Sequence, residues 1–451
     1  MRTSNKIPLN LNGMKVSVIG GAKSGLAATK LLKKIGANPF VSDMNKSADL
    51  SPLKKIDVPF EKGSHSDKIY DCDLMVVSPS IPQDSDIVMK AIKNKISIIS
   101  EIELASWFTS IPIIAITGSN GKTTTTTILA EMCRKSGLNT FESGNIGTPF
   151  STIVLKNLNN NYYDAIHIVE VSSFQMEQIQ YFKPKVAIIL NLSHDHLDRY
   201  GTMKSYIKAK LNIVYNMRSD DHLVYNLDDK LLRESIKTEA TLVPFSLKNQ
   251  NNLDFSLNES MVYDKMGEKF LLLDEIKIKG LHNISNFLAA ATAAKIIKIQ
   301  EKAIKEVMRT FTGVPHRLEE VRTKNGVAFY NDSKATNLES VKVAIKSFNN
   351  PIILIIGGRN KGENFKDLQN LILSKVKLVI AIGEIADEIE KEFEQSTIVK
   401  KGSSMSSAVS IAHKNSLRGD LVLLSPGCAS FDMFNNFEER GDVFKKEVMR
   451  L

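Results

Sequence analysis

The sequence contains few cysteines and no long apolar run. Its three cysteines, Cys72, Cys133 and Cys428, lie far apart and have no spacing typical of a metal site. This usage indicates a reducing compartment and argues against a disulfide framework. No apolar run reaches the roughly 18 residues that a membrane-spanning helix needs, and the first residues lead into no signal segment. We therefore expect a cytoplasmic protein that does not insert into membranes.

Long blocks of one charge are also lacking. The net charge is +9, but the basic residues are dispersed, and no block of five or more like charges occurs. Aromatic residues do not interleave with arginines as they do in many nucleic-acid interfaces. A lysine-rich solvated surface and small anionic substrates explain the charge better than a nucleic-acid partner.

At 451 residues the chain exceeds one hydrophobic core. Strands alternate with helices in three blocks, which predicts an α/β fold of three domains. We expect a Rossmann-like domain over residues 1–103, a central P-loop ATPase-type domain over 104–313, and a Rossmann-like α/β domain over 314–451.

Several elements can be placed within these blocks. The polar, β-like segment Thr238–Glu275 predicts a small sheet at the edge of the central block, which an alanine-rich helix over Asn286–Ile299 would close. In the third block, three apolar strands begin near Ile352, Leu378 and Leu421 and end in glycine or serine. They predict a parallel sheet that is covered on both faces.

The most specific motif runs from Thr117 to Thr124, between an apolar strand and a helix that ends near Gly137. Strand, glycine loop, lysine and helix together are typical of a nucleotide triphosphate site. Its glycines would let backbone N–H groups face phosphate oxygens, its lysine would add a charge, and Thr123 would reach Mg²⁺. Because isoleucine stands at position 116, where the consensus has glycine, the match is to a shortened variant. The alternative is an ordinary glycine-rich turn.

A second glycine loop, Gly20–Gly25, follows the first strand. Ala22 stands where the dinucleotide fingerprint has its second glycine, although Asp43 lies near the expected ribose-binding distance. The loop could bind a diphosphate through backbone N–H groups and Ser24, or be a plain strand–helix turn.

Acidic residues and histidines follow two strands of the central block. Glu170 ends an apolar strand and is well placed to hold Mg²⁺, although a buried ion pair is the alternative. The segment Asn191–Tyr200 brings two histidines and two aspartates together. Without a cysteine partner or a helical histidine pair, it favours Mg²⁺ or Mn²⁺ handling with one histidine over a zinc site.

Taken with Gly144–Gly147, His282-Asn283, His316-Arg317, Asn331–Asn337 and Ser425–Ser430, these segments resemble the Mur ligase family over nearly the whole chain. Asp195–Tyr200, Asn331–Asn337 and Ser425–Ser430 are similar to the family members that use D-glutamate. The resemblance implies an ATP-dependent ligase that joins D-glutamate to UDP-N-acetylmuramoyl-L-alanine in peptidoglycan precursor synthesis. It implies an acyl-phosphate intermediate, two Mg²⁺ ions that Mn²⁺ can replace, and a monomeric enzyme.

The same resemblance assigns site residues. Residues that would act catalytically are Lys122, His196, Lys210 and Lys361. Residues that would bind ATP are Gly118, Ser119, Asn120, Gly121, Lys122, Thr123, Thr124, Asn283, Arg317 and Asp332. Residues that would bind the UDP-substrate are Ala22, Lys23, Ser24, Asp43 and Asn145. Residues that would bind D-glutamate are Lys334, Thr336, Lys361, Ser430 and Phe437. Metal ligands would be Thr123, Glu170, His196 and Lys210, the last as a carbamate formed from CO₂.

A carbamate at Lys210 is chemically reasonable because it converts a cation that repels Mg²⁺ into an anion with oxygen ligands. Spacing alone does not choose between Lys210 and Lys208; the family match favours Lys210. Three other functions stay open: a folylpolyglutamate-type ligase, a dehydrogenase that uses the Gly20–Gly25 loop, and a non-catalytic nucleotide sensor.

Overall fold

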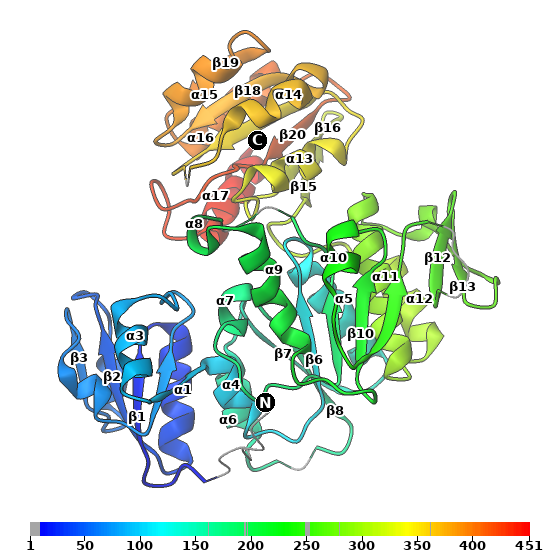
Figure 1. Ribbon diagram of the computed structural model, residues 1–451. Coiled ribbons are helices and arrows are strands. Elements are labelled where there is room, and N and C mark those ends of the chain that lie inside the picture. The colour runs from blue at the N-terminus through cyan, green and yellow to red at the C-terminus, as the bar shows by residue number, and fades with distance from the viewer. Residues whose placement is uncertain are drawn as a thin grey trace. The chain divides into compact units, whose positions relative to one another are not determined.

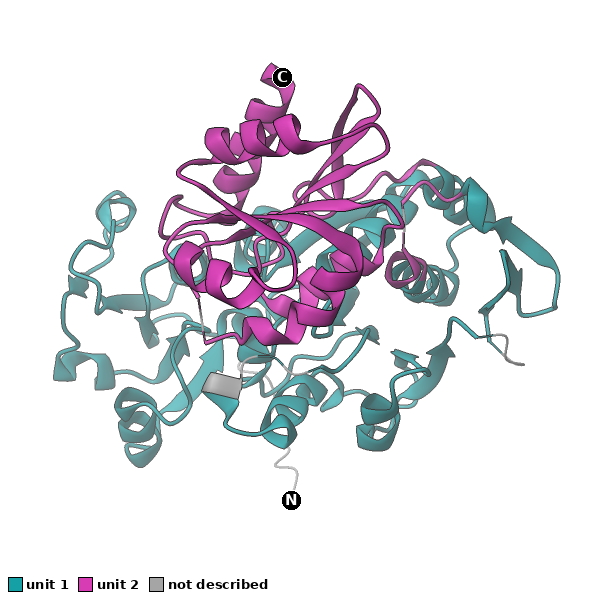
Figure 2. Cartoon of the chain, turned by 90° about the horizontal axis from the view of Figure 1, so that it is seen from above, with its two compact units in different colours: residues 1–275, 285–309 teal, residues 276–284, 310–451 magenta. Residues whose placement is uncertain are grey.

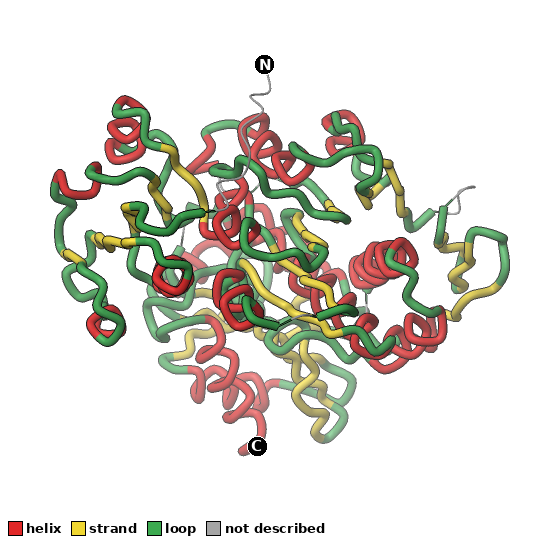
Figure 3. Tube along the Cα trace, turned by 90° about the horizontal axis from the view of Figure 1, so that it is seen from below, coloured by secondary structure: helices red, strands yellow, loops and turns green. Residues whose placement is uncertain are grey.

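The computed structural model describes residues 10–160, 162–193, 195, 197–248, 253–278, 280–360 and 362–451. Packing divides the chain into two compact units, which Figure 2 colours separately. Unit 1 comprises residues 1–275 and 285–309, and unit 2 comprises residues 276–284 and 310–451. Helices alternate with strands along both units, which confirms the α/β class; Figure 3 colours the helices and strands. The boundaries at 103/104 and 313/314 stay predictions.

Unit 1 begins with a parallel sheet in the order β3-β2-β1-β4-β5. Its strands are β1 (Lys15–Ile19), β2 (Asn38–Asp43), β3 (Phe60–Lys62), β4 (Leu74–Val77) and β5 (Ser97–Ser100). Its helical segments are α1 (Lys23–Lys34), α2 (Ser51–Lys54), the 3₁₀ turn η1 (Asp67–Tyr70), α3 (Asp86–Lys93) and α4 (Glu101–Ser106). The strand order reverses between β1 and β4, where doubly wound sheets bind ligands at their carboxyl edge.

A second parallel sheet in unit 1 has the order β11-β10-β9-β6-β8-β7, and Figure 1 labels β6, β7, β8 and β10 among its strands. Its strands are β6 (Ile113–Thr117), β7 (Asn139–Gly144), β8 (Ala165–Glu170), β9 (Val186–Ile189), β10 (His222–Asn226) and β11 (Thr241–Phe245). Between them run α5 (Lys122–Lys135), α6 (Phe150–Asn157), α7 (Ser173–Met176), α8 (Leu197–Tyr200), α9 (Met203–Leu211), η2 (Asn212–Val214) and α10 (Lys230–Ser235). Strand β6 is buried along its whole length, as its unbroken apolar sequence predicts.

The segment Thr238–Glu275 is only partly the small sheet that we expected. Its first strand, β11, extends the large parallel sheet by pairing with β10. The remainder forms an antiparallel sheet of β12 (Phe255–Asn258), β13 (Met261–Asp264) and β14 (Lys269–Leu272), followed by η3 (Leu273–Glu275). Helices α11 (Leu281–Ile296) and α12 (Glu301–Thr310) come next, so the alanine-rich helix begins and ends earlier than expected.

Unit 2 holds a sheet in the order β15-β16-β20-β17-β18-β19. Its strands are β15 (Glu319–Lys324), β16 (Val327–Asn331), β17 (Ile352–Gly357), β18 (Val376–Ile382), β19 (Ile398–Gly402) and β20 (Leu421–Leu424). Its helical segments are α13 (Leu338–Lys346), η4 (Phe365–Leu368), α14 (Gln369–Lys375), α15 (Ala386–Phe393), α16 (Met405–Asn415) and α17 (Phe437–Arg450). The three apolar strands expected to be parallel, β17, β18 and β20, are parallel as predicted. The edge strand β15, which was not predicted, pairs with β16 in an antiparallel hairpin.

The two parallel sheets of unit 1 contribute to one apolar core. Helix α1 packs against α6, and α4 packs against both helices. Trp107 lies in this core, and its indole N–H donates to the Glu103 carboxylate at 2.6 Å. Within the described ranges, no helix combines the length and the apolar composition needed to cross a bilayer.

Candidate functional site

The glycine loop after β6 has the geometry of a phosphate cradle. Gly121 precedes α5 with a φ of +86°, and a Cβ there would lie 2.4 Å from the Asn286 side-chain oxygen. Only glycine fits that combination of backbone and space. The Lys122 ammonium donates to the carbonyl oxygens of Gly118 and Ser119 at 2.8 and 2.9 Å. The loop therefore brings a cation and the N-terminus of a helix to one place, which suits a polyphosphate.

The segment after β9 holds this loop in position. The Asn191 side chain accepts from the Asn120 N–H at 2.8 Å and donates to the Asn120 carbonyl at 3.0 Å. The Ser119 hydroxyl contacts the Tyr206 hydroxyl at 2.9 Å and accepts from the Ser193 N–H at 2.9 Å. Sequence reasoning assigned no role to Asn191 or Tyr206. The only available signal was an asparagine directly after an apolar strand.

Glu170 ends β8 beside the phosphate loop and is 2% exposed. One carboxylate oxygen accepts from the Thr123 hydroxyl at 2.7 Å, and the other accepts from the Asn145 amide at 3.0 Å. A carboxylate and a hydroxyl that already meet offer the oxygen ligands that Mg²⁺ prefers. Thr123 and Glu170 therefore fit the expected metal site. His196 lies outside the described residues.

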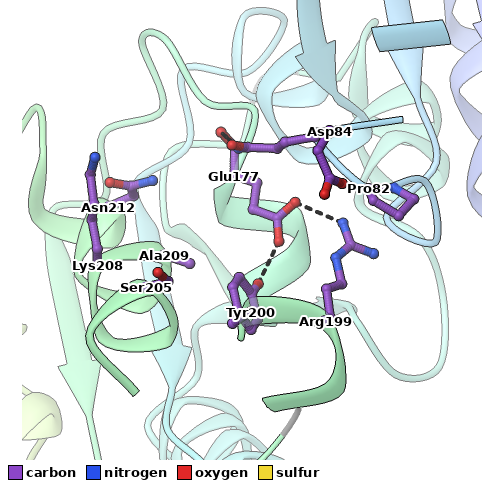
Figure 4. Close-up of a pocket in the computed structure, with 10 residues that line it drawn as sticks. Pro82, Asp84, Glu177, Arg199, Tyr200, Ser205, Lys208, Ala209 and Asn212 are labelled. Atoms are coloured by element: carbon purple, nitrogen blue, oxygen red, sulfur yellow. Dashed lines mark hydrogen bonds and ion pairs between the residues drawn. The ribbon is translucent and has the colours of Figure 1, made fainter. Parts of the chain in front are cut away.

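Lys210, on α9, is 2% exposed, and its amine donates to the Gly118 carbonyl at 2.8 Å. Burial, and next the charge of Lys122, hold the pKa of Lys210 well below its usual range, whereas Asp195 and Glu170 act in the opposite direction. An amine with a lowered pKa is more often unprotonated and nucleophilic. Lys208 lies on the same helix but lines a different cavity, away from the phosphate loop (Figure 4). The geometry therefore favours Lys210 as the carbamate candidate.

The first glycine loop gathers the residues expected to bind the UDP-substrate except Asn145, which lies beside Glu170. Asp43, at the end of β2, accepts from the Gly21 N–H at 2.6 Å. Ala22 caps α1, whose first turn contains Lys23 and Ser24. A Cβ on Gly25 would lie 1.8 Å from the Gly20 carbonyl oxygen, so the helix starts directly against the strand. The loop leaves backbone N–H groups at a helix N-terminus, which suits a diphosphate.

In unit 2, Asp332 follows β16 and is 5% exposed. It accepts from the Ser425 hydroxyl at 2.9 Å and from the Leu318 N–H at 3.2 Å. Burial raises the pKa of Asp332 to about 7, against the opposing charge of Arg317. Asn283 and Arg317 belong to the same unit as Asp332, whereas the phosphate loop belongs to unit 1.

The residues expected to bind D-glutamate also lie in unit 2. The Lys334 ammonium lies 5.7 Å from the centre of the Phe437 ring. Ser430 is buried and follows β20, Thr336 is half-buried, and Lys361 lies outside the described residues. Sequence reasoning missed Arg440, which is 1% exposed and donates to the Ser333 and Cys428 carbonyls at 2.8 and 3.1 Å. Arg440 thus ties together two of the loops that carry these residues.

Comparison with known proteins now identifies the family. Residues 15–87 match the profile of the MurD N-terminal domain, residues 116–294 that of the Mur ligase middle domain, and residues 316–428 that of the Mur ligase glutamate ligase domain. The chain belongs to the Mur ligase family. The UDP-N-acetylmuramoylalanine–D-glutamate ligase of Salinibacter ruber is 38% identical over 98% of this Mur ligase and 99% of its own chain. The protein of the same name from Clostridioides difficile is 40% identical over 98% of this Mur ligase and 100% of its own chain.

Solved structures show the same fold at lower identity. The UDP-N-acetylmuramate–alanine ligase of Thermotoga maritima superposes with a TM-score of 0.61 at 18% identity, covering 97% of this Mur ligase and 99% of its own chain. A pseudomurein peptide ligase from Methanothermus fervidus superposes with a TM-score of 0.58 at 22% identity, covering 97% of this Mur ligase and 100% of its own chain. The expected three-domain α/β class is thus confirmed. Membership of the Mur ligase family implies the use of ATP with Mg²⁺.

Proposed function

We propose that this chain is an ATP-dependent ligase that adds D-glutamate to UDP-N-acetylmuramoyl-L-alanine in peptidoglycan precursor synthesis. One observation carries the proposal: the Lys122 ammonium lies against the carbonyls of the glycine loop and the Thr123 hydroxyl meets the Glu170 carboxylate, which suits a phosphate and a metal ion, within a chain that is similar over nearly its full length to relatives of that name. The residues suited to phosphate support a reaction that uses ATP. The names of the relatives indicate which acceptor and which amine the reaction joins.

The chemistry proceeds in two balanced steps. An oxygen of the alanyl carboxylate attacks the γ-phosphorus of ATP, which forms an acyl phosphate and releases ADP. The D-glutamate amine then attacks the acyl carbon, phosphate leaves, and the amine loses a proton. Lys122 and the N–H groups of the loop stabilise the charge that develops on the transferring phosphoryl group.

Metal binding is assigned to Thr123 and Glu170, and a second ion to His196. Magnesium bound there would supply positive charge to the transferring phosphoryl group, and Mn²⁺ shares the preference for oxygen ligands. Lys210 adds its amine to CO₂ and loses a proton, which gives an anionic carbamate. Its burial and the lowered pKa of its amine support this assignment.

The remaining site residues keep the roles that the resemblance gave them. Gly118, Ser119, Asn120, Gly121, Thr124, Asn283, Arg317 and Asp332 bind ATP. Ala22, Lys23, Ser24, Asp43 and Asn145 bind the UDP-substrate. Lys334, Thr336, Lys361, Ser430 and Phe437 bind D-glutamate. A monomeric state and a cytoplasmic location stay predictions.

ADP release in a matrix of acceptors and amines tests the function. We expect release only when UDP-N-acetylmuramoyl-L-alanine and D-glutamate are both present. Release with a folate acceptor and L-glutamate would instead favour the folylpolyglutamate-type alternative. Nicotinamide dinucleotide binding to the first glycine loop would favour the dehydrogenase, and ATP binding without turnover on any pair would favour the sensor.

A further inference from the structure

Arg199 and Tyr200 close the segment Asp195–Tyr200, and the function proposed above uses neither of them. Both lie on the short helix α8. The Arg199 side chain is only 14% exposed although it carries a full charge. A buried guanidinium is expensive unless all its contacts are satisfied, so its partners show what it does.

Two of these partners belong to the loop that follows β4. Arg199 donates from Nη1 to the Pro79 carbonyl at 2.7 Å and from Nη2 to the Ile81 carbonyl at 3.0 Å. The same loop begins at Ser78, whose Cβ would lie 2.6 Å from a Cβ added at Gly20. The loop held by Arg199 therefore contacts the glycine loop that we assign to the UDP-substrate.

The third partner is Glu177, which lies beyond α7 in the part of unit 1 that carries the phosphate loop. Arg199 Nη2 donates to its carboxylate at 2.7 Å, and the Tyr200 hydroxyl donates to the other oxygen at 2.5 Å (Figure 4). The guanidinium also lies 4.4 Å from the centre of the Phe174 ring. Donors pointing in several directions from one plane are available to arginine but not to lysine.

Helix α8 is also linked to the phosphate loop, through Tyr200. Tyr200 packs 5.5 Å from the ring of Tyr206, whose hydroxyl contacts Ser119 of that loop at 2.9 Å. Asp195, just before the helix, acts electrostatically on Lys210 and Tyr206. One short helix therefore contacts both the loop beside the UDP-substrate site and the residues around the phosphate loop.

We propose that Arg199 is a positioning residue that fixes the loop Ser78–Ile81 relative to the phosphate loop, so that the carboxylate end of the nucleotide-sugar acid arrives where phosphoryl transfer occurs. This inference rests on the proposed function. It concerns the placement of the acid end, not recognition of the uridine diphosphate end. A displacement of about 1 Å at a reacting centre can cost about a hundredfold in rate.

Binding measurements test the placement without requiring turnover. We compare UDP alone with UDP-N-acetylmuramoyl-L-alanine by titration calorimetry, in the intact chain and in Arg199→Ala and Arg199→Lys. Both variants should bind the complete ligand about tenfold or more weakly and bind UDP as the intact chain does. The control is Arg218→Ala, which removes an exposed pair with Glu239 whose side chains are 49% and 54% exposed, and it should change neither affinity.

Guanidinium rescue separates positioning from a general loss of structure. Arg199 lines part of a cavity of about 280 Å³, together with Glu177 and Tyr200 (Figure 4). In Arg199→Ala, a small cation can therefore reach the place that the guanidinium group occupies in the intact chain. Millimolar guanidinium should restore tight binding of the complete ligand to Arg199→Ala, but not to Arg199→Lys, whose side chain fills the place.

Each other outcome overturns the inference. Equal weakening of UDP and the complete ligand, no weakening of either, or failure of guanidinium to rescue Arg199→Ala would each refute a positioning role. So would an intact chain that binds the complete ligand no more tightly than UDP. An intact chain that shows this binding pattern but releases no ADP would refute the proposed function alone.

Discussion

Replacement of Gly144 by alanine should separate backbone strain from a steric clash at the metal site. Gly144 ends β7 with a φ of +116°, and a Cβ there would lie 2.1 Å from the carbonyl oxygen of Glu170. Gly147 lies in the same turn with a φ of +76°, but a Cβ there would meet no atom within 4 Å. Gly147→Ala is therefore the matched control.

The expected costs differ because only one site has an obstacle. Positive φ costs either alanine about 1–2 kcal/mol. At Gly144 the overlap is with backbone, which cannot rotate away, and overpacking of this kind adds about 1–3 kcal/mol. We expect a loss of unfolding free energy of about 2–5 kcal/mol for Gly144→Ala and about 1–2 kcal/mol for Gly147→Ala.

Urea unfolding measures the difference. Trp107, the only tryptophan in the chain, lies in the core of unit 1, so its fluorescence reports on the unit that contains both glycines. Gly144→Ala should also lower ADP release about a hundredfold, because the end of β8 carries Glu170. Equal destabilisation by the two substitutions, or normal activity of Gly144→Ala, would refute the reasoning.

Three further predictions have defined outcomes. Lys122→Ala should lose about 3 kcal/mol of transition-state stabilisation in kcat/KM for ATP, and near-normal turnover would contradict its role. Lys210→Ala should lose most ADP release while the fold stays intact, whereas Lys208→Ala should stay active. An active chain whose intact mass shows an unmodified Lys210 would contradict the carbamate. Burial raises the pKa of Asp332 from its ordinary 3.8 to about 7, so the folded chain holds this proton more tightly than the unfolded chain. The protonated Asp332 therefore adds to the free energy of unfolding below about pH 4, and this contribution is lost as the pH rises through about 7. In urea titrations, the unfolding free energy of Asp332→Asn should decrease less over this pH range than that of the intact chain.

Local patterns predicted the parts of the fold that local physics determines. The buried strand β6, the glycines that permit positive φ and the helix α5 follow from neighbouring residues, so the phosphate loop was visible in the sequence. Glu170 was found because it ends an apolar strand, and Asp43 because it lies near the expected ribose-binding distance from the first glycine loop.

Long-range contacts could not be predicted in this way. Nothing near Arg440 in the sequence indicates that its guanidinium is buried against Ser333 and Cys428. The pairing of β11 with β10 depends on the tertiary arrangement, not on the β-like composition of the segment. Lys210 and Lys208 have the same local sequence environment, and only the packing of α9 buries one of them.

Isotope transfer tests the central claim most directly. The alanyl carboxylate of UDP-N-acetylmuramoyl-L-alanine is labelled with ¹⁸O, and the phosphate released in the presence of ATP and D-glutamate is analysed by mass spectrometry. An acyl phosphate places one carboxylate oxygen in each phosphate, so the account predicts singly labelled phosphate together with ADP. Unlabelled phosphate, or AMP and pyrophosphate as products, would contradict it.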